Sequence, residues 1–452
     1  MPGISRTTWQ RVWLYPRLVV SAVCVVPPPS DSRAFPFRVR GWLKGFALVA
    51  SLAAAHAFAQ ITQGAHEGQS AFAAGDASAA SAVRGGDVYD LLIGTYTANG
   101  KSEGIYVYRF DARTGHATRL AAARAVNPSY LAVSRDARRV YAVNELPGDK
   151  GPATERGSVS AFAFDARSGQ LTFLNRVSSE GNDPCYLSLS PDGRNLMVAN
   201  YSVAADPGGS FAALPLEADG ALGGALLSVR YEGGGPVKGR QDSAHVHSTV
   251  FSPDGRYLFV QDLGGDKLYT YRYPPDGRRG LLRPGAAAHV AMSSGSGPRH
   301  LVFDANGHYA YLTNELAGTV SAFLHVNGQL TLLQTLPLAA PGFQGKIAAG
   351  AIHLSPDGRF LYATNRGDAN EIVVFEVDRY DGLLTLAGRH SSLGRTPREF
   401  AIDPSGQWLI VGNQDSDTAY IFRRNVQTGL LDPNPTRLDV GSPVDFKLVP
   451  VS

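Results

Sequence analysis

The stretch AGAIHLSPDGRFLYATNRG, residues 349–367, decides the fold because its pattern occurs six times along the chain. Apolar residues alternate with polar ones, a Ser-Pro-Asp-Gly turn interrupts them, and a second apolar run ends near an Asn. This order of strand, tight turn and strand is the signature of a β-hairpin. The other copies are NPSYLAVSRDARRVYAVNE at 127–145, DPCYLSLSPDGRNLMVANY at 183–201, HVHSTVFSPDGRYLFVQDL at 245–263, GPRHLVFDANGHYAYLTNE at 297–315 and TPREFAIDPSGQWLIVGNQ at 396–414.

A second hairpin pattern alternates with the first and occurs seven times. Two clear examples are GIYVYRFDARTGHATRL at residues 104–120 and GSVSAFAFDARSGQLTFL at residues 157–174. Two hairpins per repeat make a four-stranded sheet. A repeat period of roughly 50 residues is typical of propeller blades.

The two ends of the chain predict the number of blades. SPVDFKLVP, residues 442–450, matches the first strand of the repeat but has no second strand after it. DLLIGTY, residues 90–96, matches the second strand but has no first strand before it. Pairing the two segments completes a blade and protects the open edge of the ring. The sequence therefore predicts an all-β, seven-bladed β-propeller of four-stranded blades over residues 87–452, closed by its C-terminal strand.

Composition agrees with this fold and excludes several classes of function. A Gly count of 50 and a Pro count of 28 suit short strands joined by tight turns. The formal net charge of +3 is too small to indicate nucleic-acid binding, so no nucleic-acid partner is expected. Cys24 and Cys185 are the only cysteines, and processing of the N-terminus would leave Cys185 alone. No internal disulfide and no cysteine metal cage are then possible.

The N-terminal segment differs in composition from the repeats. Basic residues that include Arg40 and Lys44 precede the apolar run GFALVASLAAAHAFA, which ends at Ala59. This is the pattern of a signal peptide, so residues 1–59 are expected to be an extension cleaved after Ala59. The run is too short and Ala-rich to predict a membrane span. Residues 60–86 are expected to form a flexible Ala/Gly/Ser-rich lead-in. The mature protein is expected to be periplasmic or secreted, with a cytoplasmic location as the alternative.

The repeat register predicts which residues meet at the central channel. The start of the first strand and the end of the second lie at the same face because the two strands are antiparallel. Strand starts form a first ring of Ser129, Cys185, His247, Arg299, Gly350, Arg398 and Val444. Strand ends form a second ring of Tyr96, Glu145, Tyr201, Leu263, Glu315, Arg366 and Gln414. The ionisable residues of both rings are therefore expected to gather at one mouth of the channel.

Three residues at this mouth are expected to be catalytic. His247 is the best candidate for a general base because an unperturbed imidazole has a pKa near ~6.5. Arg299 supplies positive charge for an oxyanion or a carboxylate. Glu315 has two interpretations, since it could pair with Arg299 across the hairpin or orient Arg299 or the attacking water.

Other residues at the mouth are expected to bind the substrate. Guanidinium groups bind carboxylate or phosphate in bidentate fashion, and we expect this of Arg366 and Arg398. The further expected contacts are His245, His300, Glu145 and Tyr201. His245 and His247 would suit a metal, but no third ligand lies nearby in the repeat register, so neither a metal nor a cofactor is expected. The side chains of His247, Arg299, Arg366 and Arg398 are expected to lie near solvent.

At these residues the chain resembles the lactonase family of seven-bladed propellers. That family includes bacterial 6-phosphogluconolactonases and the fungal enzyme that lactonises 3-carboxy-cis,cis-muconate. The most specific motifs are HVHS at 245–248, GPRH at 297–300, TNE at 313–315, TNRG at 364–367 and TPREF at 396–400. The resemblance implies active-site residues that fall on His247, Arg299, Glu315 and either Arg366 or Arg398, and it implies no metal. The phosphogluconolactonase members act in the cytoplasm, so the export predicted here departs from their pattern.

The expected function is hydrolysis of a sugar-acid lactone that carries an anionic group. No Gly-x-Ser-x-Gly elbow is present, so attack by water is expected instead of a serine acyl-enzyme. A cycloisomerase acting on a carboxylated muconate is an alternative that needs the same residue types. A non-catalytic exported propeller that binds a ligand is a second alternative, because one fold carries many functions.

Overall fold

In the computed structural model, which describes residues 87–147, 156–274 and 282–451, the repeated Ser-Pro-Asp-Gly segments form tight turns. Ser252 Oγ donates a hydrogen bond to Asp254 Oδ1 at 2.6 Å and accepts one from the Tyr257 amide at 3.1 Å. Gly255 follows with a φ of 70°, in the left-handed region that glycine adopts without strain. The Ser and Asp side chains therefore close the turn, and the glycine lets the chain reverse into the next strand.

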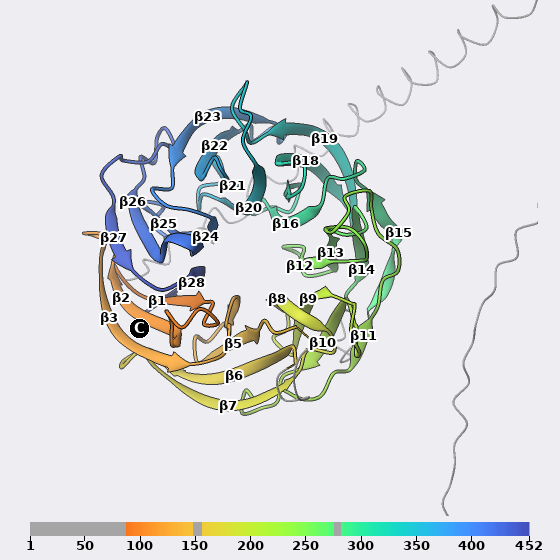
Figure 1. Ribbon diagram of the computed structural model, residues 1–452, viewed down its shortest axis with the longest axis horizontal. Coiled ribbons are helices and arrows are strands. Elements are labelled where there is room, and N and C mark those ends of the chain that lie inside the picture. The colour runs from red at the N-terminus through yellow and green to blue at the C-terminus, as the bar shows by residue number, and fades with distance from the viewer. Residues whose placement is uncertain (1–86, 148–155, 275–281, 452) are drawn as a thin grey trace, which may run out of the picture. The chain divides into compact units, whose positions relative to one another are not determined.

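Every hairpin of this kind forms the inner half of a four-stranded antiparallel sheet, and seven such sheets form a ring (Figure 1). The innermost strands are β28 (Pro443–Pro450), β4 (Leu131–Val133), β8 (Asn182–Leu189), β12 (Val246–Phe251), β16 (Pro298–Phe303), β20 (Ile347–Leu354) and β24 (Pro397–Ile402). The second strands are β1 (Val88–Thr95), β5 (Arg139–Asn144), β9 (Asn195–Ser202), β13 (Tyr257–Asp262), β17 (Tyr309–Asn314), β21 (Phe360–Gly367) and β25 (Trp408–Asn413).

The outer hairpin of each blade completes the sheet. The third strands are β2 (Gly104–Asp111), β6 (Ser158–Asp165), β10 (Phe211–Pro215), β14 (Lys267–Arg272), β18 (Thr319–Val326), β22 (Glu371–Val377) and β26 (Thr418–Arg423). The outermost strands are β3 (His116–Arg124), β7 (Gln170–Ser178), β11 (Leu227–Val229), β15 (Arg283–Ala291), β19 (Gln329–Pro337), β23 (Leu384–Ser391) and β27 (Thr436–Asp439). Within the described ranges the single helical element is the short 3-10 helix η2 (Gln414–Ser416). The predicted seven-bladed propeller is confirmed.

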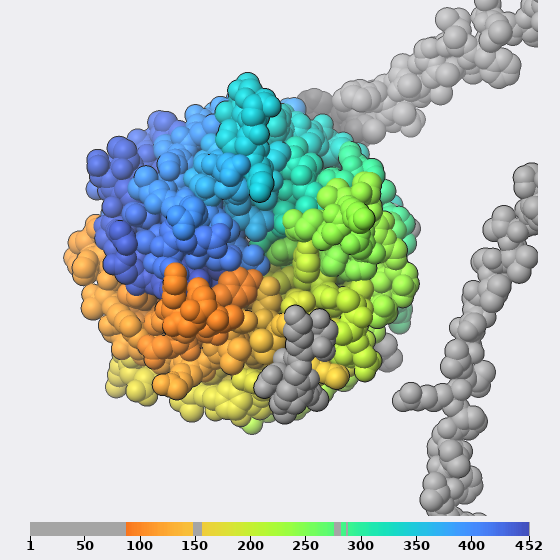
Figure 2. Space-filling view, in the orientation of Figure 1, coloured from red at the N-terminus to blue at the C-terminus, as the bar shows by residue number. Residues whose placement is uncertain are grey.

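The ring closes as the sequence predicts. Strand β28, near the C-terminus, pairs antiparallel with β1, and Leu448 lies opposite Leu91 in that register. The first blade therefore contains both ends of the propeller, and Figure 2 shows the last segments beside the first ones on the surface. Trp408 of the neighbouring blade reinforces the joint, since its indole Nε1 donates to the carbonyl of Ala112 at 2.6 Å.

The hydrophobic core lies between blades. Each cluster of buried apolar side chains joins two neighbouring sheets, as when Ile93 and Phe110 of the first blade pack with Ile410 and Ile421 of the seventh. The same arrangement recurs at the other six interfaces. Apolar contact between blades thus stabilises the ring, and the inner strand ends are held at fixed positions around the channel.

Some predictions concern parts of the chain that the structure does not describe. The signal peptide, its cleavage after Ala59 and the lead-in of residues 60–86 lie outside the described residues. Where the chain is described, no helix has the length and apolar character needed to cross a membrane.

Candidate active site

The residues of the first ring, apart from Ser129, lie at β-bulges. In the pairing of β12 with β13, Val246 faces Asp262 and Ser248 faces Gln261, so His247 is an extra residue between them. Similar irregularities occur at Cys185, Arg299, His300, Gly350, Arg398 and Val444. A bulge bends its strand and changes the direction of the bulged side chain. This explains how successive inner strands direct functional groups to one mouth of the channel.

Glu315 is the centre of one half of this mouth, which we call the Glu315 half. Its carboxylate accepts from Arg299 Nε at 3.0 Å, from Arg366 Nη2 at 2.8 Å and from Arg240 Nη2 at 2.5 Å. Burial opposes ionisation of Glu315, but Arg366 and the other guanidinium groups outweigh it and hold the pKa of the carboxyl well below its ordinary value. Glu315 therefore stays charged at neutral pH and is unsuited to accept a proton.

His247 lies beside this carboxylate. Its Nε2 is 3.9 Å from Glu315 Oε2, and its Nδ1 is 3.9 Å from Cys185 Sγ. The ring of Tyr201 meets the imidazole edge-on, with 5.7 Å between ring centroids. Burial, and next to it the positive charge of Arg299, lower the pKa of His247 well below its ordinary value. The imidazole is therefore neutral at physiological pH and free to accept a proton.

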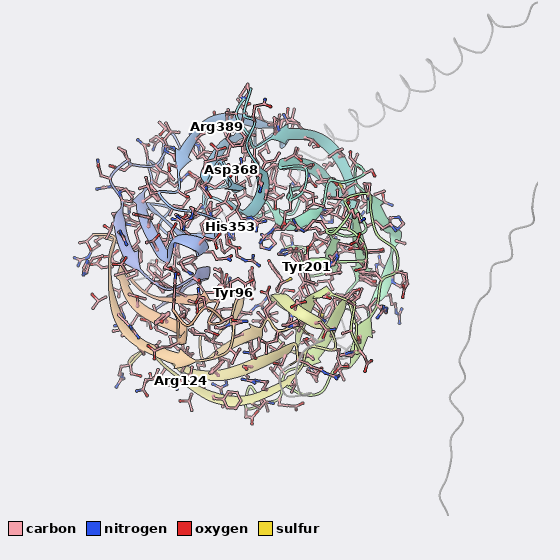
Figure 3. The ribbon with its side chains drawn as sticks, viewed as in Figure 1. Tyr96, Arg124, Tyr201, His353, Asp368 and Arg389 are labelled. Carbon is pink, nitrogen blue, oxygen red and sulfur yellow. The ribbon has the colours of Figure 1, made fainter. Side chains whose placement is uncertain are left out.

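Glu145 is the centre of the other half, which we call the Glu145 half. Tyr96 Oη donates to the carboxylate, at 2.8 Å from each oxygen, and the hydroxyl of Ser129 also donates to it. Arg398 Nη2 stands 4.0 Å from Glu145 Oε1, and its guanidinium lies over the Tyr96 ring at 5.2 Å from the centroid. Figure 3 places Tyr96 and Tyr201 near the centre of the ring, whereas Arg124 and Arg389 lie toward the outside. The mouth predicted from the repeat register thus exists.

The expectation that His247, Arg299, Arg366 and Arg398 lie near solvent is wrong for Arg299 and His247, and the other two are only partly exposed. The side chain of Arg299 is only 1% exposed and that of His247 only 6%. Arg366 and Arg398 are 11% and 18% exposed. The seven inner strands approach one another closely at the channel. Their bulged residues pack against each other, and this contact buries them. Burial, with Arg366 next to it, lowers the pKa of Arg299 to about 10, so its guanidinium still carries a charge at neutral pH.

The sequence patterns missed Arg240, although it contacts Glu315 directly. This residue lies between β11 and β12, in a segment with no counterpart in the repeat. Gln241 anchors the segment by donating from Nε2 to the carbonyl of Leu263 at 2.8 Å. Arg240 Nη2 also donates to Tyr201 Oη at 3.3 Å, and the Arg240 side chain is 44% exposed. The one feature of the sequence that could have indicated Arg240 is its place in the longest interval between two copies of the repeated hairpin, which start at residues 183 and 245.

The two other histidines predicted at the mouth, His245 and His300, contact Tyr201 and Arg299. His245 Nδ1 is 2.6 Å from the carbonyl oxygen of Tyr201, and the two rings stack with 4.5 Å between centroids. His300 is buried, and its Nε2 lies 3.1 Å from Arg299 Nη1. Both histidines therefore contact residues of the mouth, and neither belongs to the group around Glu315 Oε2.

The mouth has no evident metal ligand set, and its cysteine is a poor nucleophile. In the described part of the chain, no group of three or more His, Cys, Asp or Glu side chains is arranged to hold a metal ion. Cys185 is buried and forms no disulfide. Burial, followed by the charge of Glu145, raises the pKa of its thiol well above the ordinary value. The thiol therefore stays protonated.

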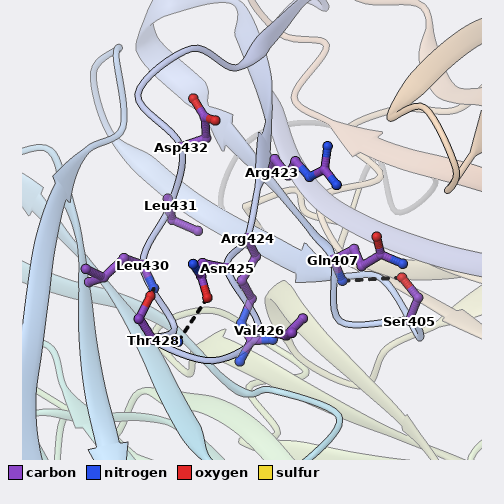
Figure 4. A pocket seen from close by; sticks show the side chains of 10 residues that line it. All are labelled: Ser405, Gln407, Arg423, Arg424, Asn425, Val426, Thr428, Leu430, Leu431 and Asp432. Atoms are coloured by element: carbon purple, nitrogen blue, oxygen red, sulfur yellow. Dashed lines mark hydrogen bonds between the residues drawn. The ribbon is translucent and has the colours of Figure 1, made fainter.

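A separate pocket lies at the face where the Ser-Pro-Asp-Gly turns gather, in the seventh blade (Figure 4). Its lining includes Arg423, Arg424 and Asp432. The guanidinium of Arg424 is already engaged, because Nη1 donates to the carbonyl of Gly406 at 2.8 Å and Nε donates to the hydroxyl of Tyr362. No histidine lines this pocket. The candidate catalytic residues lie instead at the opposite end of the channel, around Glu315 and Glu145.

Comparisons with known proteins agree with this geometry. A family model described as "Lactonase, 7-bladed beta-propeller" matches residues 90–448. The 6-phosphogluconolactonase of Formosa agariphila is 37% identical over 352 residues, covering 77% of this chain and 96% of that protein. The 6-phosphogluconolactonase of Bacillus subtilis is 33% identical over 364 residues, covering 80% of this chain and 98% of that protein. The solved structure of the periplasmic gluconolactonase of Pseudomonas aeruginosa has a TM-score of 0.76 and 47% identity, covering 81% of this chain and 100% of that one. The chain therefore belongs to the lactonase family of seven-bladed β-propellers.

Proposed function

We propose that this lactonase hydrolyses a sugar-acid lactone with an anionic group, using a water molecule that His247 activates. The observation that carries the proposal is a buried imidazole whose Nε2 lies 3.9 Å from the Glu315 carboxylate, in a mouth where arginines outnumber acids. Relatives named 6-phosphogluconolactonase and gluconolactonase support the same class of substrate.

His247 is the proposed general base. Nε2 would take a proton from water as the water oxygen attacks the lactone carbonyl carbon. The imidazolium formed in this step would be stabilised by Glu315, whose Oε2 lies 3.9 Å from Nε2. When the tetrahedral intermediate collapses, the ring C–O bond breaks and the ring oxygen takes the proton from His247. The product is an open-chain hydroxy acid, and His247 is again neutral.

Arg299 is the proposed donor to the developing oxyanion. Its Nε is held by Glu315 and its Nη1 by His300, at 3.0 Å and 3.1 Å. Nη2 then remains for a substrate oxygen. A donor held in advance and shielded from water stabilises developing charge more than a mobile surface group does. Glu315 thus has a role in orienting Arg299, which was one of its two predicted interpretations.

The anionic group of the substrate is assigned to the remaining arginines. Four guanidinium groups face two carboxylates at the mouth, which are those of Glu315 and Glu145. This excess of positive charge attracts an anion. Arg398 is the leading candidate for direct contact because its distance to Glu145 is 4.0 Å, too long for a hydrogen bond. Arg366 and the half-exposed Arg240 would complete the binding site, with His245, His300, Glu145 and Tyr201 around it.

We further propose that the mature protein acts in the periplasm after cleavage following Ala59. The Pseudomonas aeruginosa structure that it resembles is described as periplasmic. Cell fractionation and N-terminal sequencing of the mature protein test this. Recovery in the cytoplasm with residues 1–59 attached would contradict it.

A substrate screen of the purified protein tests the function. Proton release is measured with δ- and γ-lactones of sugar acids, with and without phosphate, and with a carboxylated muconate as the cycloisomerase substrate. Lactone turnover that EDTA leaves unchanged is the expected result. Turnover of the muconate alone, or activity lost in EDTA and restored by a divalent metal, would contradict the proposed mechanism.

A further inference from the structure

A second pair of ionisable residues lies behind Arg299. His300 follows Arg299 on β16, and Glu399 follows Arg398 on β24. Both are buried, with His300 at 6% and Glu399 at 2% exposure. Neither belongs to the catalytic steps proposed above, and burying ionisable groups costs free energy unless they are paired. Their contacts therefore require an explanation.

The contact with Arg299 determines which nitrogen of His300 carries the proton. Arg299 Nη1 and His300 Nε2 are 3.1 Å apart. A guanidinium can only donate, so Nε2 must accept and the imidazole must be neutral with its proton on Nδ1. That Nδ1 faces Glu399 Oε2 at 3.6 Å. The order of groups is therefore guanidinium, imidazole, carboxylate, with a hydrogen bond at the first contact and, at 3.6 Å, a longer electrostatic contact at the second.

Glu399 carries a charge although it is buried. Its Oε1 lies 2.7 Å from His353 Nε2. Burial opposes ionisation, but His353, Lys447 and Arg299 hold the pKa of the carboxyl below its ordinary value. Two carboxylates thus act on one guanidinium, Glu315 at Nε directly and Glu399 at Nη1 through His300.

We infer that His300 and Glu399 are positioning residues, which fix the plane of the Arg299 guanidinium for the lactone hydrolysis proposed above. A guanidinium held at one edge alone can rotate about its side-chain bonds. Contacts at both Nε and Nη1 remove that rotation and leave Nη2 pointing in one direction. Misplacement of a reacting group by about 1 Å can lower a rate by up to roughly 100-fold. The pair therefore controls the rate through the orientation of Arg299.

The first test does not depend on activity. Side-chain ¹⁵N NMR of the wild-type protein at pH 7, with His300→Asn used to assign the resonances, reports the tautomer of His300. The expected result is a neutral imidazole protonated at Nδ1. A His300 that is protonated on Nε2, or on both nitrogens, would overturn the inference.

The second test is a double-mutant cycle on the lactonase reaction. Glu399→Gln in the wild type should lower kcat by roughly 10- to 100-fold with little change in KM, because Arg299 is less well oriented. The same replacement in an Arg299→Lys background should change kcat by less than about 2-fold, since no planar guanidinium is left to orient. Equal losses in both backgrounds would show a merely structural role.

His353→Gln is the matched control. His353 contacts the same carboxylate but is 39% exposed and has no contact with Arg299, so its replacement should change kcat by less than about 3-fold. Thermal unfolding checks each variant, and His300→Gln replaces Glu399→Gln in the cycle if the latter does not fold. Absence of lactonase activity in the wild type would contradict the proposed function, whereas the NMR result would still decide the arrangement of His300 and Arg299.

Discussion

The two halves of the mouth hold their carboxylates in different ways. Glu315 is bound by three charged guanidinium groups, all within 3.0 Å. Glu145 is bound by the hydroxyls of Tyr96 and Ser129, and the nearest guanidinium, Arg398, is 4.0 Å away. One carboxylate is saturated by charge, whereas the other is held by neutral donors.

This difference separates two tasks of an enzyme that binds an anion and hydrolyses an ester. In the Glu315 half, three guanidinium groups donate to one carboxylate, so these groups are fixed in orientation for catalysis. In the Glu145 half, neutral hydroxyls hold the carboxylate and leave Arg398 less constrained, so its charge is available to a ligand. The comparison predicts that catalytic rate depends mainly on the first half and substrate affinity mainly on the second.

Replacing His247 should have the largest effect. His247→Ala should lower kcat by roughly 10²- to 10⁴-fold with little change in KM, the usual consequence of losing a general base. Steady-state kinetics with the best lactone of the screen measures this. A folded variant with full activity would exclude His247 as the base and favour a different nucleophile activation.

Replacing Arg398 should affect binding instead. Arg398→Ala should raise KM by roughly 10- to 100-fold for an anionic lactone, the range expected for losing a hydrogen bond to a charged group. A neutral lactone of the same ring size should show a much smaller change. Arg366→Ala is the matched comparison from the Glu315 half. KM should rise there too, because Arg366 is assigned to the anionic group, but kcat should also fall because Arg366 holds Glu315. Identical kinetic changes in the two variants would remove the distinction between the halves.

The pH profile should respond in opposite directions to two charge changes in the Glu315 half. The pKa of His247 is lowered by burial and by Arg299, and Glu315 raises it. Neutral His247, the form that acts as the base, therefore predominates at neutral pH. We expect kcat/KM to fall only at a pH below the ordinary imidazole pKa of about 6.5. Arg299→Gln removes a positive neighbour and should move this acid limb to higher pH, by about one unit.

Glu315→Gln removes a negative neighbour and should move the limb to lower pH by a similar amount, about one unit. NMR titration of the His247 ring gives the same comparison if a variant is too slow for kinetics. Shifts of the same sign in both variants would show that His247 is not the titrating group.

The smallest effect is expected from Cys185, which lies between the two halves. Its Sγ is 3.9 Å from His247 Nδ1, an arrangement that superficially resembles a thiol–imidazole pair. Because burial raises the pKa of the thiol, Cys185→Ser should change kcat by less than about 2-fold. Trapping of an acyl group on the thiol, seen by mass spectrometry, would contradict attack by water.

Much of this arrangement is predictable because the repeat carries its own register. The turn at Ser355 and Asn365 near the end of the next strand define a copy, and equivalent positions in the other copies follow by counting. Counting along the repeat in this way places His247, Arg299 and Glu315 at one mouth. Residue counting also predicted the pairing of β28 with β1, since each segment lacks the partner that the other provides.

Burial and the role of Arg240 were not predictable in this way. The counting assumes regular strands, and it contains no information on how closely seven inner strands approach one another. Arg299 was therefore expected near solvent, although it is almost fully enclosed. Arg240 lies outside the repeat, so no equivalent position in another blade indicates it. Its contact with Glu315 depends on the path of the segment before β12, which no local pattern determines.

The bulges of the inner strands have a consequence for how such a propeller can change. A bulged residue is an extra one, so the regular ladder continues on either side of it whatever side chain it carries. His247, Arg398 and Cys185 occupy such positions, in separate blades. Each of these blades thus contributes an interchangeable position to a common mouth, while the apolar contacts that hold the ring lie elsewhere. New combinations of side chains can be sampled there one blade at a time, which makes the mouth a modular surface for the divergence of substrate specificity.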